Sequence, residues 1–551
     1  MEKPKQRSAV IREEIRNYGK QYGMLLLVSL AAAALCYGFL VFSGTIRIDT
    51  EELMNHPGSK LGWLSIGRFG LAFLKDMLGL QTHHMVWSGL LFFLFFWLGA
   101  NLLTFGIYHF SGGKPYSYWI FLLLYSTSNI WSYQVYFSVQ QAEVACAMLL
   151  LVLAAFLSVQ AVFEKKGAAC IWRFLVSFVL LVLGLGAYQA LAVYYIAACL
   201  IFFLVWIMRE TGSKQEERCG RLLLRCLGFV LFFVCAYAAY AVIADTWFMA
   251  GADYMNEQSG WGRYPVTDCI KNVLRTAKNL LFVVGPRNFS FYPAAVLFTA
   301  VWLVRMFAGV YGRQGGRRFV LWLLALAALL ASPLFMTLYM GEMLVTRAQF
   351  ALPPAAAFLG MYAIDGLSER RKSDEKAVVQ KRAACFGVWA RRLGIIFVSV
   401  VLLGQCTYDL RLAYTDQVRF EDDAAKTEQL LTLLAEANGG TLPTQPIAFV
   451  GYQQAELPKW CRRTEMYGWS FYEWDYDSNR PAGATHRIVG LIQAHTGVVL
   501  EEAVTEEQLL AAAQLAQPLS DFPADGCIAV TDELVVVRLS AQEEPPATDW
   551  W

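Results

Sequence analysis

Long apolar runs constrain the fold of this chain more than any other feature of its sequence. A transmembrane helix needs about 20 consecutive apolar residues, and runs of that length recur along the chain up to residue 411. Of the 551 residues, 57% are hydrophobic and 16% are charged, whereas soluble domains carry about 25% charged residues. The chain is therefore predicted to be a mostly α-helical, polytopic membrane protein with about eleven spans. The spans are expected near residues 22–43, 84–110, 117–132, 140–163, 173–189, 190–208, 226–248, 291–309, 319–340, 349–366 and 393–411, with a hinge at "GLGAYQA" between the fifth and the sixth.

The distribution of Lys and Arg predicts the orientation of these spans, because short cytoplasmic loops are enriched in both. The tail of residues 1–20 is basic, and the first span after it lacks a small-residue cleavage site, so this tail is expected to stay cytoplasmic. Alternate loops are also basic, most densely the loop 367–392. The intervening loops, including the loop 44–83, are then extracytoplasmic. An odd number of spans places the residues after 411 on that side as well.

Residues 412–551 have the patterns of a soluble domain. "AAKTEQLLTLLAEANGG" has helical spacing and ends in Gly-Gly, a helix stop signal. "PIAFVGY" predicts a buried strand, and "GCIAVTDELVVVRLS" predicts a hairpin that turns at Thr-Asp-Glu. A small extracytoplasmic α/β or α+β domain is therefore predicted after a transmembrane domain of residues 21–411. Cys461 and Cys527 fall in this C-terminal part, where either a disulfide or two unpaired buried thiols fits the sequence.

The first extracytoplasmic loop is unusually acidic for a segment between two spans. Asp49 and Glu51 follow the end of the first apolar run by only a few residues, and Glu52 comes next. These acids could belong to an ordinary solvated loop or to the start of a short helix. Alternatively, a carboxylate held at the membrane surface can act as a general base toward a sugar hydroxyl.

The same loop continues with a stretch of near-helical apolar spacing, "LGWLSIGRFGLAFLKDMLGL", which contains Arg68. This pattern is typical of a helix that lies in the membrane interface. A simple linker helix would fit it equally well.

Other polar and aromatic residues are predicted on the same side of the membrane. Gln140 lies in "NIWSYQVYFSVQQAEVA", and Tyr188 and Gln189 lie at the hinge between two apolar halves. Amides and aromatic rings suit sugar binding, although Trp and Tyr also mark the interface belt of any membrane protein.

Two arginines on this side suggest a phosphate site. Arg287 lies in "GPRNFSFYP", and Arg347 directly precedes a span in "YMGEMLVTRAQFALPP". A guanidinium group matches two phosphate oxygens at once. An arginine at this position can also be a snorkelling anchor.

The order of several of these motifs resembles the glucosyl transferase Gtr type II family of bacterial membrane proteins. They are "IDTE…W…GRFG", "YFSVQQAEVACAMLL", "GAYQALAVYYIA" and "TRAQFALP", followed by "YGWSFYEWDYDSNR" in the C-terminal part. The resemblance implies a GT-C-like bundle that uses a polyprenyl-phosphate sugar and an acid in its first outer loop. It aligns Asp49 with the catalytic acid, Glu51 with its neighbour, Arg68 with the arginine of a "GR" motif and Arg347 with a late-loop arginine. The family's usual Asp-Asp pair is Asp-Thr-Glu here, which leaves open which carboxylate is the base.

With this resemblance, the chain is expected to be an inverting glycosyltransferase that moves a hexose, with glucose favoured, from undecaprenyl phosphate to a surface polysaccharide or wall glycan. A flippase or transporter of lipid-linked sugars and a polysaccharide polymerase or ligase are the alternatives. The sequence has no Walker A loop, no GxGxxG motif and no cytoplasmic DxD motif, so it does not support a nucleotide-sugar site. No metal-ligand cluster and no nucleic-acid partner are predicted, and a requirement for a divalent cation such as Mg²⁺ or Mn²⁺ stays open.

Overall fold

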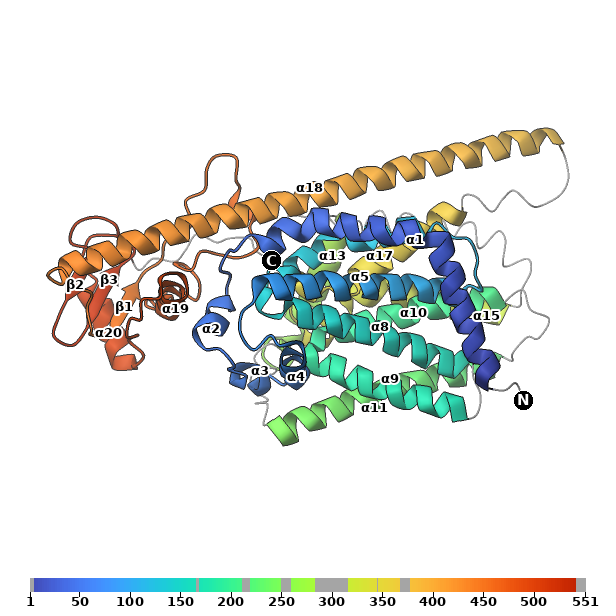
Figure 1. The fold of residues 1–551 in the computed structure, drawn as a ribbon, viewed down its shortest axis with the longest axis horizontal. Coiled ribbons are helices and arrows are strands. Elements are labelled where there is room, and N and C mark those ends of the chain that lie inside the picture. Colours follow the sequence, from blue (N-terminus) through green and yellow to red (C-terminus); the bar gives the residue numbers. More distant parts are fainter. Residues whose placement is uncertain are drawn as a thin grey trace.

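Long helices packed side by side make up most of the molecule, as the apolar runs predict (Figure 1). The computed structural model describes residues 4–164, 168–210, 219–248, 259–282, 316–343, 345–366 and 377–541. Within these residues, eight helical segments are long and apolar enough to cross a membrane. They are Ile11–Phe42, Met85–Phe110, Ser138–Phe163, Cys170–Ala187, Gln189–Arg209, Gly220–Phe248, Val320–Met340 and Arg391–Ala437. The protein is thus a mostly helical transmembrane protein.

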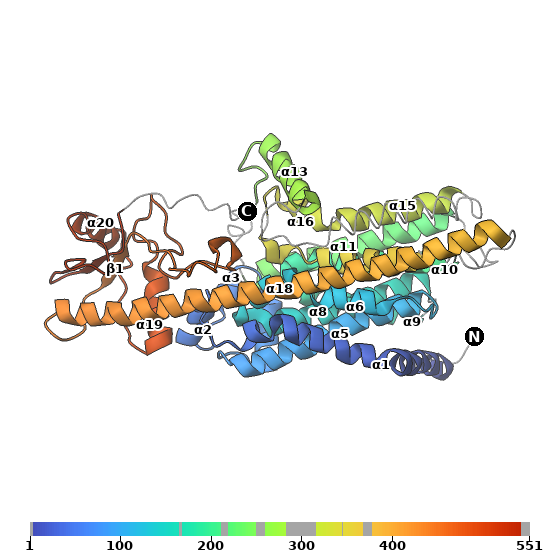
Figure 2. The ribbon, with the colours of Figure 1, turned by 90° about the horizontal axis from the view of Figure 1, so that it is seen from above.

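The helices of the bundle follow one another along the chain. They are α1 (Pro4–Phe42), α2 (Thr50–Asn55), α3 (Leu61–Ser65), α4 (Phe69–Leu78), α5 (Met85–Phe110), α6 (Tyr118–Ser126), α7 (Asn129–Val135), α8 (Gln141–Phe163), α9 (Ala168–Ala187), α10 (Ala192–Glu210), α11 (Cys219–Phe248), α13 (Val266–Phe282), α15 (Gly316–Ala331), α16 (Phe335–Met340), α17 (Leu352–Gly366) and α18 (Ala377–Ala437). Short 3₁₀ turns connect several of them: η1 (Ser138–Gln140), η2 (Gln189–Leu191), η3 (Ser332–Leu334) and η4 (Thr346–Ala348). Helix α13 projects sideways from the bundle instead of following its long axis (Figure 2).

Three of the eleven predicted spans have no counterpart among these eight segments. The short third span is occupied by two helices, α6 and α7, which a break at residues 127–128 separates. Residues 291–309 lie outside the described residues. The tenth span coincides with α17, whose 15 residues are fewer than the roughly 20 that a straight crossing needs. The hinge at "GLGAYQA" is confirmed, because α9 ends at Ala187 and η2 separates it from α10.

The prediction of a single helix over residues 61–80 is wrong. The structure has two short helices there, α3 and α4, which are separated at residues 66–68. Gly67 has a φ of 76°, a left-handed conformation that glycine adopts at little cost and that ends a helix. The apolar spacing continues across this break, which is why the pattern alone predicts one helix.

Helix α18 runs past one end of the bundle without a break (Figure 1). Its 61 residues correspond to a length of about 90 Å at 1.5 Å per residue. The hydrocarbon core of a bilayer is only about 30 Å thick, so the helix extends far beyond a single crossing. The domain boundary predicted at residue 411 falls inside α18, which also contains the helix predicted from "AAKTEQLLTLLAEANGG".

The residues after α18 form a small layered structure, the C-terminal region (residues 438–541). Strands β1 (Ile447–Val450), β2 (Ile528–Val530) and β3 (Val535–Arg538) form a sheet in the order β1-β3-β2, in which β1 is parallel and β2 antiparallel to β3. The predicted buried strand and the predicted hairpin are both confirmed. Helices α18 and α19 (Thr485–Thr496) cover one face of the sheet, and α20 (Glu506–Leu515) packs with the other.

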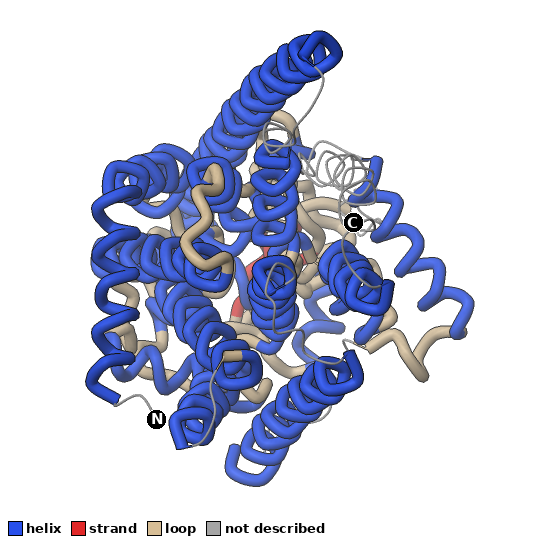
Figure 3. The backbone as a smooth tube through the Cα atoms, turned by 90° about the vertical axis from the view of Figure 1, so that its right-hand side faces the viewer, coloured by secondary structure: helices blue, strands red, loops and turns tan. Residues whose placement is uncertain are grey.

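The side chains of β1 alternate between these two faces. Ile447 and Phe449 join the core with α18 and α19, whereas Ala448 and Val450 pack with α20. Figure 3 looks along the bundle, with the sheet behind the helices. We call the end of the bundle beside the C-terminal region the sheet end. Cys461 and Cys527 are separate buried thiols, which agrees with the unpaired alternative.

A buried chain of charges connects the loop after α1 to α18 and to the C-terminal region. Arg47 donates from Nε to Asp416 at 2.9 Å. Arg419 pairs with the other oxygen of Asp416 at 3.2 Å and with Asp423 at 2.7 Å. Asp423 accepts a hydrogen bond of 2.5 Å from Ser470. All five side chains are buried, so each charge depends on its partners for the stabilisation that water would otherwise provide.

This network predicts a large stability loss for Arg419→Ala. The substitution leaves the Asp423 carboxylate buried without its cation, and losing one partner of a buried ion pair costs about 3–5 kcal/mol. Lys271→Ala is the control, because Lys271 pairs with Asp268 on the exposed surface of α13, where such pairs contribute about 1 kcal/mol or less. Thermal unfolding in detergent measures both variants. Equal melting temperatures for the two would contradict a structural role for the network.

Candidate functional site

The predicted site residues meet at the sheet end, around the segment from Phe137 to Gln140 that connects α7 and α8. The Thr50 hydroxyl, between Asp49 and Glu51, lies 2.9 Å from the Ser138 hydroxyl. Gln140 accepts a hydrogen bond of 3.4 Å from Arg68. The guanidinium of Arg347 lies 3.9 Å from the centre of the Phe137 ring. Segments widely separated in sequence are thus brought to one place. Arg287 lies outside the described residues.

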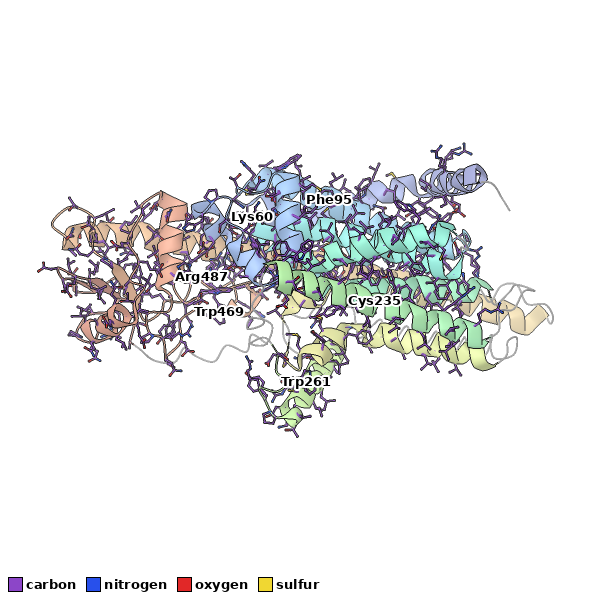
Figure 4. All side chains as sticks on the ribbon, turned by 90° about the horizontal axis from the view of Figure 1, so that it is seen from below. Lys60, Phe95, Cys235, Trp261, Trp469 and Arg487 are labelled. Atoms are coloured by element: carbon purple, nitrogen blue, oxygen red, sulfur yellow. The ribbon has the colours of Figure 1, made fainter. Side chains whose placement is uncertain are left out.

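The two carboxylates of the first loop differ in their environment. Asp49 is the N-cap of α2, has a φ of 65° and keeps 41% of its side chain exposed. The Glu51 side chain is only 2% exposed. Both accept from the same nitrogen, Nη1 of Arg487 on α19, at 3.2 Å and 2.8 Å respectively (Figure 4 labels Arg487). One carboxylate is therefore open to an incoming group and the other is held inside.

Burial controls the protonation of Glu51. The pKa of its carboxyl is raised to about 7, mainly by loss of hydration; Arg487 opposes this shift and the neighbouring Asp49 adds to it. Its Oε2 atom is buried and has no hydrogen-bond partner among the described residues. Glu51 is therefore a group that gains and loses its proton near neutral pH.

Arg68 contacts the same segment through Gln140 and also an aromatic ring. Its guanidinium stacks on Tyr188 at 4.6 Å from the ring centre. Gln189 fixes the turn in front of Arg68 by donating to the Ile66 carbonyl at 2.9 Å and to the Tyr240 hydroxyl at 2.9 Å. Tyr188 is thus in contact with the predicted phosphate-binding arginine, whereas Gln189 holds the backbone that carries it.

Arg68 and Arg347 share a property that sets them apart from Arg47, Arg419 and Arg487. Neither forms an ion pair with a carboxylate in the described part of the chain, and the Nε atom of each is buried without a hydrogen-bond partner there. The other three arginines each contact at least one acid. Two arginines at the sheet end are therefore not neutralised by the acids of the described chain.

Several buried polar atoms in this part of the protein have no hydrogen-bond partner among the described residues. Natural proteins leave few such atoms, and those that remain need an explanation such as a ligand or water. Those near the described site belong to Glu51, Arg68, Gln134, Tyr136, Gln141, Glu143 and Arg347. Amide, carboxylate and guanidinium groups together suit a ligand that carries both hydroxyl groups and negative charge.

Sequence reasoning missed the partners of these residues. Arg487 lies 436 residues after Glu51, and no local pattern connects them. Lys75, in the stretch whose apolar spacing predicts an interfacial helix, is only 2% exposed and pairs with Glu143 at 2.6 Å. The local sequence offers one hint of this pairing: Glu143 is a charged residue at the start of an otherwise apolar helix, where charges are rare.

Among the described residues, no group of three or more His, Cys, Asp or Glu side chains could hold a metal ion.

The bundle and this polar end are those of a membrane protein with a polar site at one end of its helices. The comparison with protein families agrees with this class. The family described as glucosyl transferase GtrII matches residues 38–364, from the last turns of α1 to the end of α17. The chain belongs to the GtrII glucosyl transferase family and is a glycosyltransferase, which implies a sugar donor and an acceptor. A comparison with curated proteins gives no match.

The environment of Glu51 predicts a pH-dependent stability. Its pKa is about 7 in the folded protein and 4.5 ordinarily, so the folded state binds the proton more tightly. The tighter binding of the Glu51 proton therefore stabilises the folded state fully below about pH 4.5, and this stabilisation is lost as the pH rises through about 7. The free energy of unfolding changes by roughly 3 kcal/mol over this range. Glu51→Gln should remove it, so that between pH 5 and pH 8 the melting temperature falls less in the variant than in the wild type.

Glu428→Gln, at an exposed position of α18, is the control for the loss of one acid. It should follow the wild-type pH dependence. An unchanged pH dependence in Glu51→Gln would show that Glu51 does not titrate in this range.

Proposed function

We propose that this glucosyl transferase moves a hexose, most simply glucose, from undecaprenyl phosphate to a surface polysaccharide or wall glycan. The observation that carries the proposal is the pair of arginines at the sheet end, Arg68 and Arg347, that have no acid partner among the described residues. A phosphate would give both guanidinium groups the oxygens that the described chain does not provide. Its polyprenyl tail would lie in the bilayer beside the bundle.

In this mechanism Asp49 is the general base, because its carboxylate is the exposed one of the pair. Asp49 takes the proton from an acceptor hydroxyl, and the hydroxyl oxygen forms a bond to the anomeric carbon of the hexose. The bond from that carbon to the phosphate oxygen breaks at the same time, and the bonding electrons leave with the lipid phosphate. Attack from the side opposite the phosphate inverts the anomeric carbon.

The arginines stabilise the charge that develops on the leaving phosphate. Arg347 and Arg68 would contact its oxygens, and Arg287 is a further candidate. Gln140 and Tyr188, which already contact Arg68, would hold its guanidinium in place. No general acid is needed, because the phosphate leaves as a stabilised anion.

We further propose that the sheet end is extracytoplasmic. The basic segments 165–166, 209–221, 313–318 and 367–392 adjoin or form the opposite ends of the helices, and basic segments between spans remain in the cytoplasm. The C-terminal region, in the proposed domain of residues 412–551, would then lie outside the cell with donor and acceptor.

A transfer assay tests the base. Purified protein in detergent receives a synthetic polyprenyl-phosphate glucose and a cell-wall glycan acceptor, and the sugar incorporated into the glycan is measured. Asp49→Asn should lower the rate by about 10²–10⁴-fold, the usual effect of losing a general base. Full activity of Asp49→Asn together with loss of activity in Glu51→Gln would move the role to Glu51. A parallel reaction with EDTA tests the need for a divalent cation.

The same assay tests the arginine that binds the donor. Arg347→Ala should raise the KM for the donor strongly, and Arg347→Lys should restore only part of the loss, because an ammonium cannot bind two phosphate oxygens at once. Arg263→Ala is the matched control, since Arg263 lies near a carboxylate, that of Glu342, at 3.8 Å. Wild-type kinetics for Arg347→Ala would reduce Arg347 to a membrane anchor. Sugar transport into liposomes without transfer in detergent would favour a flippase.

Reporter fusions test the orientation. A reporter after residue 551 should be active outside the cytoplasm. One inserted between residues 367 and 376, in the predicted loop 367–392 and before the start of α18, should be active inside it. The reverse result at either position would overturn the proposed sidedness.

A further inference from the structure

The contact between the C-terminal region and the first loop centres on one guanidinium. Arg487 contacts Asp49 and Glu51 through Nη1, at 3.2 Å and 2.8 Å, and Asp475 through Nε at 2.8 Å. One cation thus serves three carboxylates. Arg487 lies outside residues 38–364, which the family matches, so this contact comes from a part of the chain that the family description does not include.

Contacts other than the ion pairs of Arg487 also join α19 to α2. Next to it, His486 bridges Glu52 at 2.8 Å and Glu502 at 2.9 Å. One turn further along α19, the Gly490 carbonyl accepts from Asn55 at 2.9 Å. A Cβ atom at Gly490 would lie only 3.1 Å from the Glu51 side chain. Helix α19 therefore packs directly on α2, and this packing aims Arg487 at the carboxylates.

The charges around Glu51 explain what Arg487 does there. Asp49 and Glu52 are negative neighbours on α2, and Asp475 lies beyond the guanidinium. His486 is engaged by Glu52 and Glu502, and the buried Tyr136 after α7 interacts electrostatically with Glu51. Arg487 is the cation in direct contact with Glu51 among the described residues. Without it, two neighbouring carboxylates would repel each other, and one of them would take up a proton.

We propose that Arg487 is a positioning residue for the transfer reaction, and that it holds the Asp49 and Glu51 carboxylates in the geometry that the base requires. The C-terminal region then completes the active site from outside the family-matched part of the chain. This inference rests on the proposed function, in which Asp49 is the base.

Arg487→Gln and Arg487→Lys test the proposal beside the control His486→Gln. The control alters the same interface between α2 and α19 but contacts neither Asp49 nor Glu51. Initial transfer rates are measured from pH 5 to pH 9, together with the melting temperature at each pH. In Arg487→Gln the midpoint of the acid limb should move upward by about 1–3 pH units, which is the effect of an adjacent arginine on a carboxyl group. Arg487→Lys should move it less, and His486→Gln should keep the wild-type midpoint.

The melting temperatures test the contact without depending on activity. Arg487→Gln should lose more stability between pH 5 and pH 8 than the wild type does, because ionised Asp49 and Glu51 are no longer compensated. If Arg487→Gln is too unstable to purify, the same comparison is made with Arg487→Lys, for which the expected change is smaller and in the same direction. A wild-type pH midpoint and a wild-type pH dependence of stability in these variants would overturn the proposal. A wild-type protein that transfers no sugar would instead overturn the proposed function. The melting temperatures would still show whether Arg487 compensates the charges of Asp49 and Glu51.

Discussion

The buried chain of charges from Arg47 through Asp416 and Arg419 to Asp423 is the interaction on which the arrangement of this molecule depends. Arg47 lies at the start of the first loop, the next three residues lie on α18, and Ser470 continues the chain into the C-terminal region. A buried charge is costly unless every partner is present. The network therefore fixes the loop, the long helix and the C-terminal region relative to one another. The two carboxylates of the site, Asp49 and Glu51, follow Arg47 closely in the sequence.

The site divides its arginines into two groups. Those that hold the structure together, such as Arg419, are fully engaged by acids, whereas Arg68 and Arg347 contact aromatic rings and an amide and pair with no acid in the described residues. Aromatic faces orient a guanidinium without neutralising it. Such an arginine keeps its charge for an anionic ligand, which is the physical reason for our proposal that these two bind the lipid phosphate.

The sequence predicts the elements whose patterns are local and misses the contacts that are not. Apolar runs locate most of the membrane helices, and the strand of "PIAFVGY" and the hairpin after it are found where their patterns predict them. The break at Gly67 is missed because apolar spacing continues across it. Of the site, the motif order predicts Asp49, Arg68 and Arg347 as candidates, but nothing near Arg487 in the sequence indicates that it meets a loop more than 400 residues earlier.

The partners of the first loop are translated long after the loop itself, which affects when this loop can fold. Asp416 follows its partner Arg47 by 369 residues, and Arg487 follows Asp49 by 438. Chains generally fold from the N-terminus as they are made, so the first loop leaves the ribosome long before either partner exists. Until then its acids and Arg47 remain hydrated and unpaired. A chain truncated before α19 would contain every residue of the family-matched bundle and still lack a partner of its first loop, so that a segment translated after the bundle determines when this loop is complete.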